Sequence, residues 1–412
     1  MINVKDKFKC VGCNACAQSC PLDCIILQAD EEGFCYPNVD IEKCINCGNC
    51  EDVCPCIDKL NTSANGEMEV WCVKHLSDDI RFESSSGGAF SALAEYTIHQ
   101  NGVVIGVAMS DDCKSAKHIA VHTKKKKKKL RGSKYLQSDI GKTYILTKDF
   151  LEQGKMVLFS GTPCQIKGLK KYLNNEYDKL VCVELICHGV SSQKLWEKYV
   201  RYLEEQLHAD IDSVNFRSKK YGWKNFGTKY LIKRKRQYFK FNFEDPYFRM
   251  FNSDYSLRPS CYKCNAKNGR SGADITIGDF WKIETVYPEY NDNKGISMVL
   301  LNSNKGRNLF DKVKSSFFYT NEKLNYELAK NCNPALYKSL PYNSLRNNFY
   351  LDMNKLSFEA LSEKYTPKTV KIILRALLLK MGLWKYIEKI RGGGLTADYG
   401  ILITYKKRRK VK

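Results

Sequence analysis

Two runs of four cysteines are the residues of this sequence whose types and spacing are best suited to chemistry. Each run has the spacing C-x2-C-x2-C-x3-C and is followed by proline, and the second run repeats the first after 34 residues. The runs are Cys10, Cys13, Cys16 and Cys20, and Cys44, Cys47, Cys50 and Cys54. Thiolates are soft ligands for zinc and for iron–sulfur clusters, so the repeat predicts a pair of metal sites.

The doubled spacing is typical of bacterial-type ferredoxin modules that hold two [4Fe–4S] clusters. Three thiolates on a tight loop bind three irons of one cubane, and the fourth cysteine of the run reaches the other cluster. The resulting assignment is one cluster on Cys10, Cys13, Cys16 and Cys54, and a second on Cys44, Cys47, Cys50 and Cys20. Structural zinc sites built from paired CxxC units are the alternative, but the complete doubled spacing favours clusters.

Four further cysteines are candidates for a third site. Cys164 and Cys187 each follow a predicted strand, and Cys261 and Cys264 form a CxxC pair. Together they supply the four thiolates that a third [4Fe–4S] cluster needs. Zinc, or no metal at all, stays open as an alternative, because the four cysteines are far apart in the sequence.

The cysteine count and the first residues limit the class of protein. The chain has 19 cysteines, but its start, MINVKDKFKC, contains no apolar signal segment, so a secreted disulfide protein is not expected. The sequence contains no run of 18 apolar residues, so no membrane-spanning helix is predicted. We therefore expect a cytoplasmic protein whose thiols serve as metal ligands or in catalysis.

Charge is distributed unevenly along the chain. The net charge is +22, yet residues 1–60 carry −5 and residues 351–412 carry +10. A basic nucleic-acid-binding protein with structural clusters is one alternative that the charge suggests. No nucleic-acid-binding motif accompanies the charge, so no nucleic-acid partner is expected. The uneven distribution favours separate modules.

Strands and helices that alternate over residues 70–207 predict an α/β core. A Ser/Gly-rich turn at residues 84–88 precedes a helix, and free backbone N–H groups there are suited to seat a phosphate. A plain helix cap with flexible glycines is the alternative. The basic segment 229–241 predicts a strand or hairpin. The expected strands are 70–74, 156–160 and 180–186, and the expected helices are 89–100, 165–173 and 193–207.

Several motifs in series carry a resemblance to a known family. After the cysteine runs come RFESSSGGAFSAL, LRGSKYLQSDIG, LFSGTPCQIKGL, ELICHGVSS, and CYKC with SGADITIGDFW, in this order. Over roughly residues 5–300 the sequence resembles the coenzyme F420 hydrogenase/dehydrogenase beta-subunit family. The resemblance implies a flavin and iron–sulfur oxidoreductase that passes electrons between clusters, a bound FAD and an organic acceptor such as F420. A flavin links one-electron cluster chemistry to two-electron organic chemistry.

The resemblance also implies functional residues. It implies a cluster near the flavin on Cys164, Cys187, Cys261 and Cys264. It implies an FAD site lined by Ser85, Ser86, Gly87, Gly88, Lys134, Tyr135 and Ser138. His188, directly after Cys187, is a candidate catalytic proton donor, with a histidine hydrogen-bonded at a strand end as the alternative. Asp279 in IGDFW is a candidate for orienting a ligand, with a turn-capping aspartate as the alternative.

Two basic segments lie outside the cysteine motifs. The lysine run 124–129 predicts an exposed loop, with attraction of an anionic substrate as the alternative. Residues 368–391 predict an amphipathic helix. Packing of this helix on its own domain is favoured, and peripheral contact with an anionic membrane surface is the alternative.

The expected architecture is an N-terminal two-cluster ferredoxin domain (1–60), a larger α/β flavin-binding core and a basic helical tail (336–412). The core is expected to have a flavin-binding first part (68–170) and a second part with the third set of ligands (171–335). The predicted partners are ferredoxin or another redox protein and a small-molecule acceptor. F420 is one such acceptor, and a surface-polysaccharide intermediate is another, since a branch of the family accompanies such enzymes. A non-catalytic electron-transfer subunit feeding a partner enzyme is the alternative function.

Overall fold

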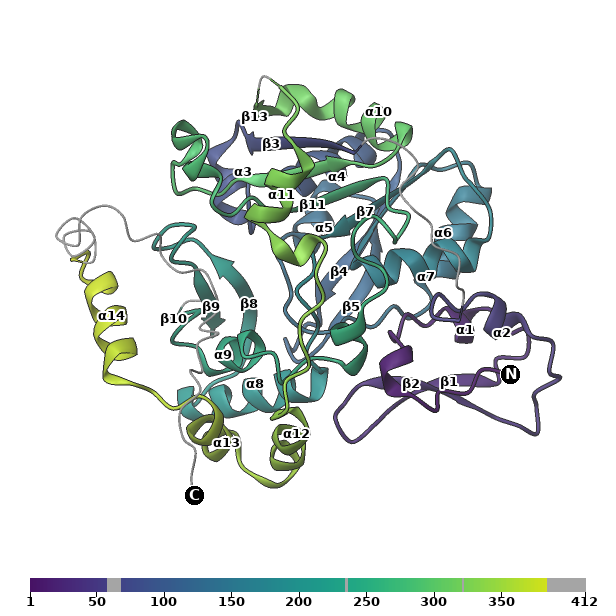
Figure 1. Ribbon diagram of the computed structural model, residues 1–412, viewed down its shortest axis with the longest axis horizontal. Helices are drawn as coiled ribbons and strands as arrows, with labels where there is room; N and C mark the ends of the chain where they lie inside the picture. The colour runs from purple at the N-terminus through teal and green to yellow at the C-terminus, as the bar shows by residue number, and fades with distance from the viewer. Residues whose placement is uncertain (58–67, 234–235, 321, 384–412) are drawn as a thin grey trace.

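The computed structural model describes residues 1–57, 68–233, 236–320 and 322–383. A small N-terminal module lies beside a larger α/β core, and helix α14 (Val370–Lys380) extends along the opposite side (Figure 1). The mixed α/β class predicted from the sequence is confirmed. The last part of the predicted helix 368–391 lies outside the described residues.

The N-terminal module repeats itself in structure as it does in sequence. Helices α1 (Ala15–Gln18) and α2 (Asn49–Asp52) occupy equivalent places in the two cysteine runs. Each follows a residue in the left-handed region, Asn14 (φ 62°) before α1 and Gly48 (φ 83°) before α2. The left-handed turn reverses the chain between the second and third cysteines of each run. The strands of the module are β1 (Ile25–Ala29) and β2 (Cys35–Val39), which pair antiparallel.

An eight-stranded sheet forms the centre of the core. Four consecutive strands, β11, β7, β6 and β4, are parallel to one another, and the remaining neighbours pair antiparallel. Strands from both predicted parts of the core, 68–170 and 171–335, share this one sheet. In sheet order the strands are β13 (Phe317–Tyr319), β3 (Glu69–His75), β12 (Ser297–Leu301), β11 (Ile275–Asp279), β7 (Leu180–Leu185), β6 (Val157–Gly161), β4 (Val103–Met109) and β5 (Ala116–Val121).

Both faces of the central strands are apolar and covered by helices. In β4, Val103 and Ile105 pack with α6 and α7, whereas Val104 packs with α4 and α10 on the opposite face. Successive side chains of a strand point to opposite faces, so a strand covered on both sides is apolar at every position. The covering helices are α4 (Ala89–His99), α6 (Thr143–Glu152), α7 (Pro163–Leu173) and α10 (Asn304–Val313).

A second sheet and an aromatic cluster complete the core. Fully buried Trp196 lies 4.6 Å from Phe216 and 4.8 Å from Tyr247 between ring centroids, and its Nε1 donates to Cys113 O at 2.7 Å. The predicted helix 193–207 and the predicted hairpin at 229–241 are confirmed. The elements of this part are β8 (Ile211–Ser218), β9 (Gly227–Ile232), β10 (Arg236–Phe241), α8 (Gln193–Leu207), α9 (Pro246–Asn252), α12 (Arg346–Lys355) and α13 (Phe358–Tyr365).

The lysine run 124–129 is not an exposed loop. It forms helix α5 (Lys124–Lys127) and part of a following 3-10 turn. Lys127 is buried, and its Nζ donates to Glu95 Oε2 on α4 at 3.0 Å. The predicted loop is wrong, because Lys124 and Lys127 both pair with Glu95 on α4, whereas the predicted exposure is confirmed for every lysine of the run except Lys127. The remaining described helices of four or more residues, short 3-10 turns aside, are α3 (Asp78–Glu83) and α11 (Tyr326–Cys332).

Helix α14 packs against the core through only a few of its described side chains. Ala376 and Leu379 pack in a cluster with Phe241, whereas most other apolar side chains of the helix are exposed. The exposed ones are Val370, Ile373, Leu374 and Leu377, followed by Met381 after the helix. Among the described residues, no helix combines the length and the apolar content needed to cross a bilayer.

The N-terminal module contacts the core at several places, and two of these contacts are on helices α7 and α12. Cys13 lies against Gly168 on α7, where a Cβ on residue 168 would stand 2.8 Å from the Cys13 Cβ. Glu32, in the turn between β1 and β2, forms an ion pair with buried Arg346 on α12, with one Oε1 to Nη1 contact of 2.8 Å. The close contact leaves room for glycine alone at residue 168.

We expect Gly168→Ala to lower the free energy of unfolding by about 1–3 kcal/mol, since the added methyl group overpacks the contact with Cys13. Denaturant unfolding and the iron retained after chelator treatment measure the effect. Gly106→Ala in β4 is the matched control, because the nearest atom to its Cβ is 3.5 Å away, and it should change stability by less than about 0.5 kcal/mol. Equal stability of the two variants would contradict the close contact.

Candidate functional site

Three cysteines of the first run and the last cysteine of the second lie together. Burial raises the pKa of Cys13 well above its usual value and that of Cys16 to about 12. The thiols of Cys10 and Cys54 raise both pKa values further, so all four are within electrostatic reach of one another. This is the set that the spacing predicts for the first cluster. These thiols must lose their protons to bind iron.

A pocket collects the ligands predicted for the second cluster. Cys20 of the first run meets three cysteines of the second run there, Cys44, Cys47 and Cys50. The backbone N–H of Ile2 donates to Cys50 Sγ at 3.2 Å. Hydrogen bonds of this kind to ligand sulfurs are one of the factors that set a cluster's reduction potential. The structure thus brings both predicted ligand sets together, each with three cysteines from one run and one from the other.

The two sets differ in their surroundings. Cys13 is buried beneath α7, whereas Cys47, its counterpart in the repeat, is exposed. In the part of the chain that the structure describes, no group of three or more His, Cys, Asp or Glu side chains is close enough together to hold a single metal ion. The four thiolates of a cubane stand further apart than the ligands of one ion, because each binds a different iron.

The other candidate residues leave the central sheet at one edge. Strands β6, β7 and β11 are parallel, and β3 runs the same way because it and β11 both pair antiparallel with β12. Cys164 follows β6, Cys187 follows β7, and Asp279 ends β11. The Ser/Gly loop (residues 84–88) comes after β3 and α3. Ligands of open α/β sheets bind outside the carboxyl ends of the strands, which is where these residues lie.

Cys164, Cys187, Cys261 and Cys264 converge at this edge from three separate segments. Cys164 is in the first turn of α7, and Cys261 is in a 3-10 turn, Pro259–Lys263. Burial raises the pKa of Cys164 to about 12, with further increases from Cys264 and Cys261. Burial also raises the pKa of Cys187 well above its usual value, and the other three thiols add to the increase. The four candidates for a third cluster therefore form one group.

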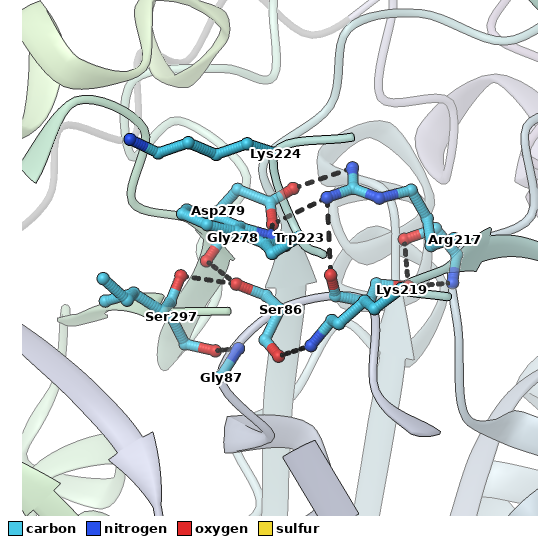
Figure 2. Close-up of polar contacts among 12 residues, drawn as sticks. Ser86, Gly87, Arg217, Lys219, Trp223, Lys224, Gly278, Asp279 and Ser297 are labelled. Carbon is cyan, nitrogen blue, oxygen red and sulfur yellow. Dashed lines mark hydrogen bonds and ion pairs between the residues drawn. The ribbon is translucent and has the colours of Figure 1, made fainter. Parts of the chain in front are cut away.

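The Ser/Gly loop is bonded to the edge of the sheet (Figure 2). The backbone N–H of Gly87 donates to Ser297 Oγ at 2.8 Å, and Lys219 Nζ donates to Ser86 O at 2.6 Å. A Cβ on residue 87 would stand 2.4 Å from a backbone oxygen of β3, so the loop requires glycine there. No side chain caps the N terminus of α4, which the loop enters. The backbone N–H of Gly87 is thus bonded within the protein, whereas no side chain bonds the N–H groups of the first turn of α4.

Arg217 connects the loop to β11 (Figure 2). Its guanidinium makes two hydrogen bonds of 3.1 Å to the Asp279 carboxylate, one of 3.0 Å to Tyr135 Oη and one of 3.3 Å to Ser85 O. Trp223 Nε1 also donates to Asp279 Oδ1, at 3.0 Å. Asp279 is therefore the shared acceptor of a buried cation and an indole, and its role in orienting a ligand stays a prediction.

Comparisons with known protein families give one match in the N-terminal module and one in the α/β core. Residues 9–57 match the model of a 4Fe-4S dicluster domain, and residues 154–325 match the model for the C terminus of the beta subunit of coenzyme F420 hydrogenase/dehydrogenase. The two matches lie on separate parts of the chain. The predicted resemblance to the beta-subunit family and the predicted iron–sulfur character of the N-terminal module are confirmed. All eight cysteines of the doubled run lie inside the dicluster match.

A solved structure is also similar. A chain of the F420-reducing [NiFe] hydrogenase complex from Methanosarcina barkeri, studied with xenon, is 17% identical, with a TM-score of 0.45. The similarity covers 67% of this chain and 92% of that one. The comparison with curated proteins found no match.

The residues predicted to line an FAD site do not all lie together. Ser85, Ser86, Gly87, Gly88 and Tyr135 surround Arg217 and Lys219 at the Ser/Gly loop. Lys134 Nζ instead donates to the carbonyls of Lys129, Leu130 and Arg131 at 3.1–3.3 Å, where burial lowers its pKa to about 7. Ser138 Oγ accepts from Gln165 Nε2 at 3.0 Å and lies 3.2 Å from His118 Nδ1. Ser138 thus belongs with the Cys164 turn of the beta-subunit domain.

His188 is paired with a carboxylate. Its Nε2 lies 2.6 Å from Asp254 Oδ1, and its ring lies 5.1 Å from that of Phe251. A carboxylate partner fixes the proton on the bonded nitrogen and orients the ring. This arrangement is that of a hydrogen-bonded histidine at a strand end, and it also leaves Nδ1 on the side of the ring away from Asp254.

Sequence reasoning missed Arg217, Lys219 and Trp223. They lie in the basic, aromatic segment FRSKKYGW, which has no spacing pattern of its own. Lys219 Nζ donates to three backbone carbonyls, those of Arg81, Ser86 and Lys294. The mixture of basic and aromatic residues in this segment is the one signal that was present.

We expect Arg217→Met to lower the free energy of unfolding by about 3 kcal/mol, since breaking a buried ion pair leaves Asp279 without its cation. The double variant Arg217→Met with Asp279→Leu should recover part of this loss. Denaturant unfolding measures both. The control is Arg201→Met, which breaks an exposed pair with Glu197 and should cost less than about 1 kcal/mol. No recovery in the double variant would refute the pairing.

Proposed function

We propose that this chain is an iron–sulfur flavoprotein oxidoreductase that passes electrons between ferredoxin-type clusters, a bound FAD and an organic acceptor. The observation that carries the proposal is the convergence of Cys164, Cys187, Cys261 and Cys264 at the sheet edge that also holds the Ser/Gly loop. Cys187 follows β7, and Asp279 ends β11, the neighbouring strand. A thiolate site and a nucleotide site side by side are what electron transfer between a cluster and a flavin requires.

The residues at the Ser/Gly loop fit the phosphates of FAD. The uncapped N terminus of α4 presents backbone N–H groups with a positive partial charge. Ser85 Oγ, which accepts from Ser133 N at 2.8 Å, and the cations Arg217 and Lys219 stand beside it. When bound, the flavin supplies the exchange between single electrons and electron pairs. Ser85, Ser86 and the start of α4 would hold it and exclude water from its phosphates.

His188 is the proposed proton donor to the acceptor. Asp254 holds the proton on Nε2, so Nδ1 is the atom that takes a proton from solvent and passes it to a reduced substrate. The ring follows Cys187 directly, which keeps the proton source beside the proposed cluster. The family description supports F420 as one acceptor. Another organic molecule, such as a surface-polysaccharide intermediate, is the second acceptor class proposed, and ferredoxin is the proposed electron donor.

A second candidate function is an electron-transfer subunit without a substrate of its own. The match to the C terminus of a beta subunit favours it, since a beta subunit is by its description one part of a larger enzyme. In that case His188 and Asp254 would be structural, and the clusters would serve a partner protein. Turnover by the purified chain alone separates the two functions.

We also infer peripheral contact of α14 with an anionic membrane surface. Its apolar side chains at 370, 373, 374 and 377 are exposed, and Lys371 and Lys380 are exposed beside them. An apolar face with basic flanks is suited to lie in a lipid headgroup region. Co-sedimentation with vesicles of anionic phospholipid, lost with Leu374→Ser plus Leu377→Ser and absent with neutral vesicles, is the expected result. Equal sedimentation of the variant would contradict it.

We expect anaerobically purified protein to carry about twelve irons per chain, four for each of three clusters. Cys261→Ala should remove about four of them, because the third site loses a ligand. Cys332→Ala, which changes a buried cysteine outside all three sets, is the control and should remove none. Iron content unchanged near eight in both the wild type and Cys261→Ala would overturn the third cluster and leave the dicluster domain standing.

We expect Ser85→Asp to weaken FAD binding at least tenfold, because an added carboxylate repels the phosphates while still accepting the bond from Ser133. Ser85→Asn introduces a neutral side chain of the same shape as aspartate, so it is the matched control. This variant should bind FAD nearly as well as the wild type. Flavin fluorescence titration measures both. An assay with reduced ferredoxin and F420 or other acceptors then decides between enzyme and carrier. Cluster reduction without turnover of any acceptor would favour the carrier.

A further inference from the structure

Arg258 is a buried cation that faces ligand loops. Its side chain belongs to a residue that is 1% exposed. Three of its hydrogen bonds, each of 2.9 Å, go to neutral acceptors, Cys10 O, Cys35 O and Gln137 Oε1. A fourth contact joins Nη2 to Cys10 Sγ at 3.6 Å. Among the described residues, no ion pair joins Arg258 to a carboxylate.

Other buried arginines at the site and at the module contact are paired. Arg217 has Asp279, and Arg346 has Glu32. A buried charge is costly unless a charge of opposite sign or a full set of hydrogen bonds compensates it. Among the described hydrogen-bond partners of Arg258, the group able to become an anion is the Cys10 thiol, which is a ligand of the first cluster in the assignment above.

The local structure is built to bring the guanidinium to the cysteine loop. Its centre lies 4.4 Å from the ring centroid of Tyr36 and 5.4 Å from that of Phe34. A Cβ on Gly12, between Cys10 and Cys13, would stand 2.8 Å from Arg258 Nη1. Gly12 is also in the left-handed region, with φ +66°. Glycine at this position therefore serves both the turn of the loop and the approach of the cation.

Arg258 also reaches the third set of cysteines. The backbone N–H of Cys261 donates to Arg258 O at 2.9 Å, so the arginine opens the turn that carries the CxxC pair. One residue thus joins two groups of proposed ligands, with its guanidinium at Cys10 and its backbone carbonyl at Cys261.

We propose that Arg258 is the buried counter-charge of the Cys10 cluster and of the neighbouring third site, and that it raises the reduction potential of the first. Reduction adds one electron and one negative charge to a cluster, and no bond is made or broken. A fixed positive charge stabilises that reduced form, because net charge and hydrogen bonds to ligands set cluster potentials. For the third site the proposal rests on the proposed function, whereas for the Cys10 cluster it needs the dicluster domain alone.

The test is a redox titration followed by electron paramagnetic resonance. The background is the full chain with Cys47→Ala and Cys261→Ala, which leaves the Cys10 cluster as the reporter with about four irons. Arg258→Gln should shift its midpoint potential to more negative values by at least 59 mV, the equivalent of a tenfold change for a one-electron couple. Arg258→Lys keeps the charge and should shift it less. Arg346→Gln, a buried arginine on the same module contact, is the control and should not shift it.

A second variant keeps the proposal testable if Arg258→Gln fails to hold iron. Gln137→Glu leaves Arg258 in place and gives it a carboxylate partner, so the potential should again become more negative. Unchanged potentials in Arg258→Gln or Gln137→Glu at full iron content would overturn the proposal, as would an equal shift in Arg346→Gln. An iron content near eight in the wild type removes the third site and leaves the result for the Cys10 cluster unaffected.

Discussion

Four parallel strands of the central sheet are apolar on both faces, so polar side chains that could bind a ligand lie at the ends of these strands. Helices α4 and α10 cover one face of the sheet, and α6 and α7 cover the other. Because the strands run the same way, the segments after them emerge at one edge. Cys164, Cys187 and Asp279 are neighbours for this reason, although they come from three different strands. The position of the candidate site is thus a consequence of strand direction.

The contact between module and core depends on the same sheet. Helix α7, which begins with the Cys164 turn, also carries Gly168, and the missing side chain there admits Cys13. A single helix therefore contacts a cysteine of the first cluster set and supplies one of the third. Cys164 and Gly168 are four residues apart on this helix, so the two sets of cysteines approach the same N-terminal half of α7. Arg258 bonds to both Cys10 and the CxxC turn.

Local sequence patterns predicted the local parts of the structure. The doubled cysteine spacing, the helix at 193–207 and the hairpin at 229–241 depend on neighbours a few residues apart, and all three are present. The partners of Arg217, Lys219, Arg258 and Lys127 lie far away in sequence, so no spacing marks them. The contacts of Lys134 with the carbonyls of residues 129–131 and of Ser138 with Gln165 were not predicted either, because a motif gives the residue and its loop but not the direction of the side chain.

The repeat in the N-terminal module has one more consequence. By sequence its halves are nearly interchangeable, with cysteines, left-handed turns and short helices at matching places. Docking removes that equivalence, since Cys13 is covered by α7 while Cys47 meets solvent. The module consequently has one side that faces solvent and one side that faces the core. The second cysteine set is therefore open to solvent at Cys47, whereas the first is covered by the core at Cys13, so two halves that match in sequence face different surroundings.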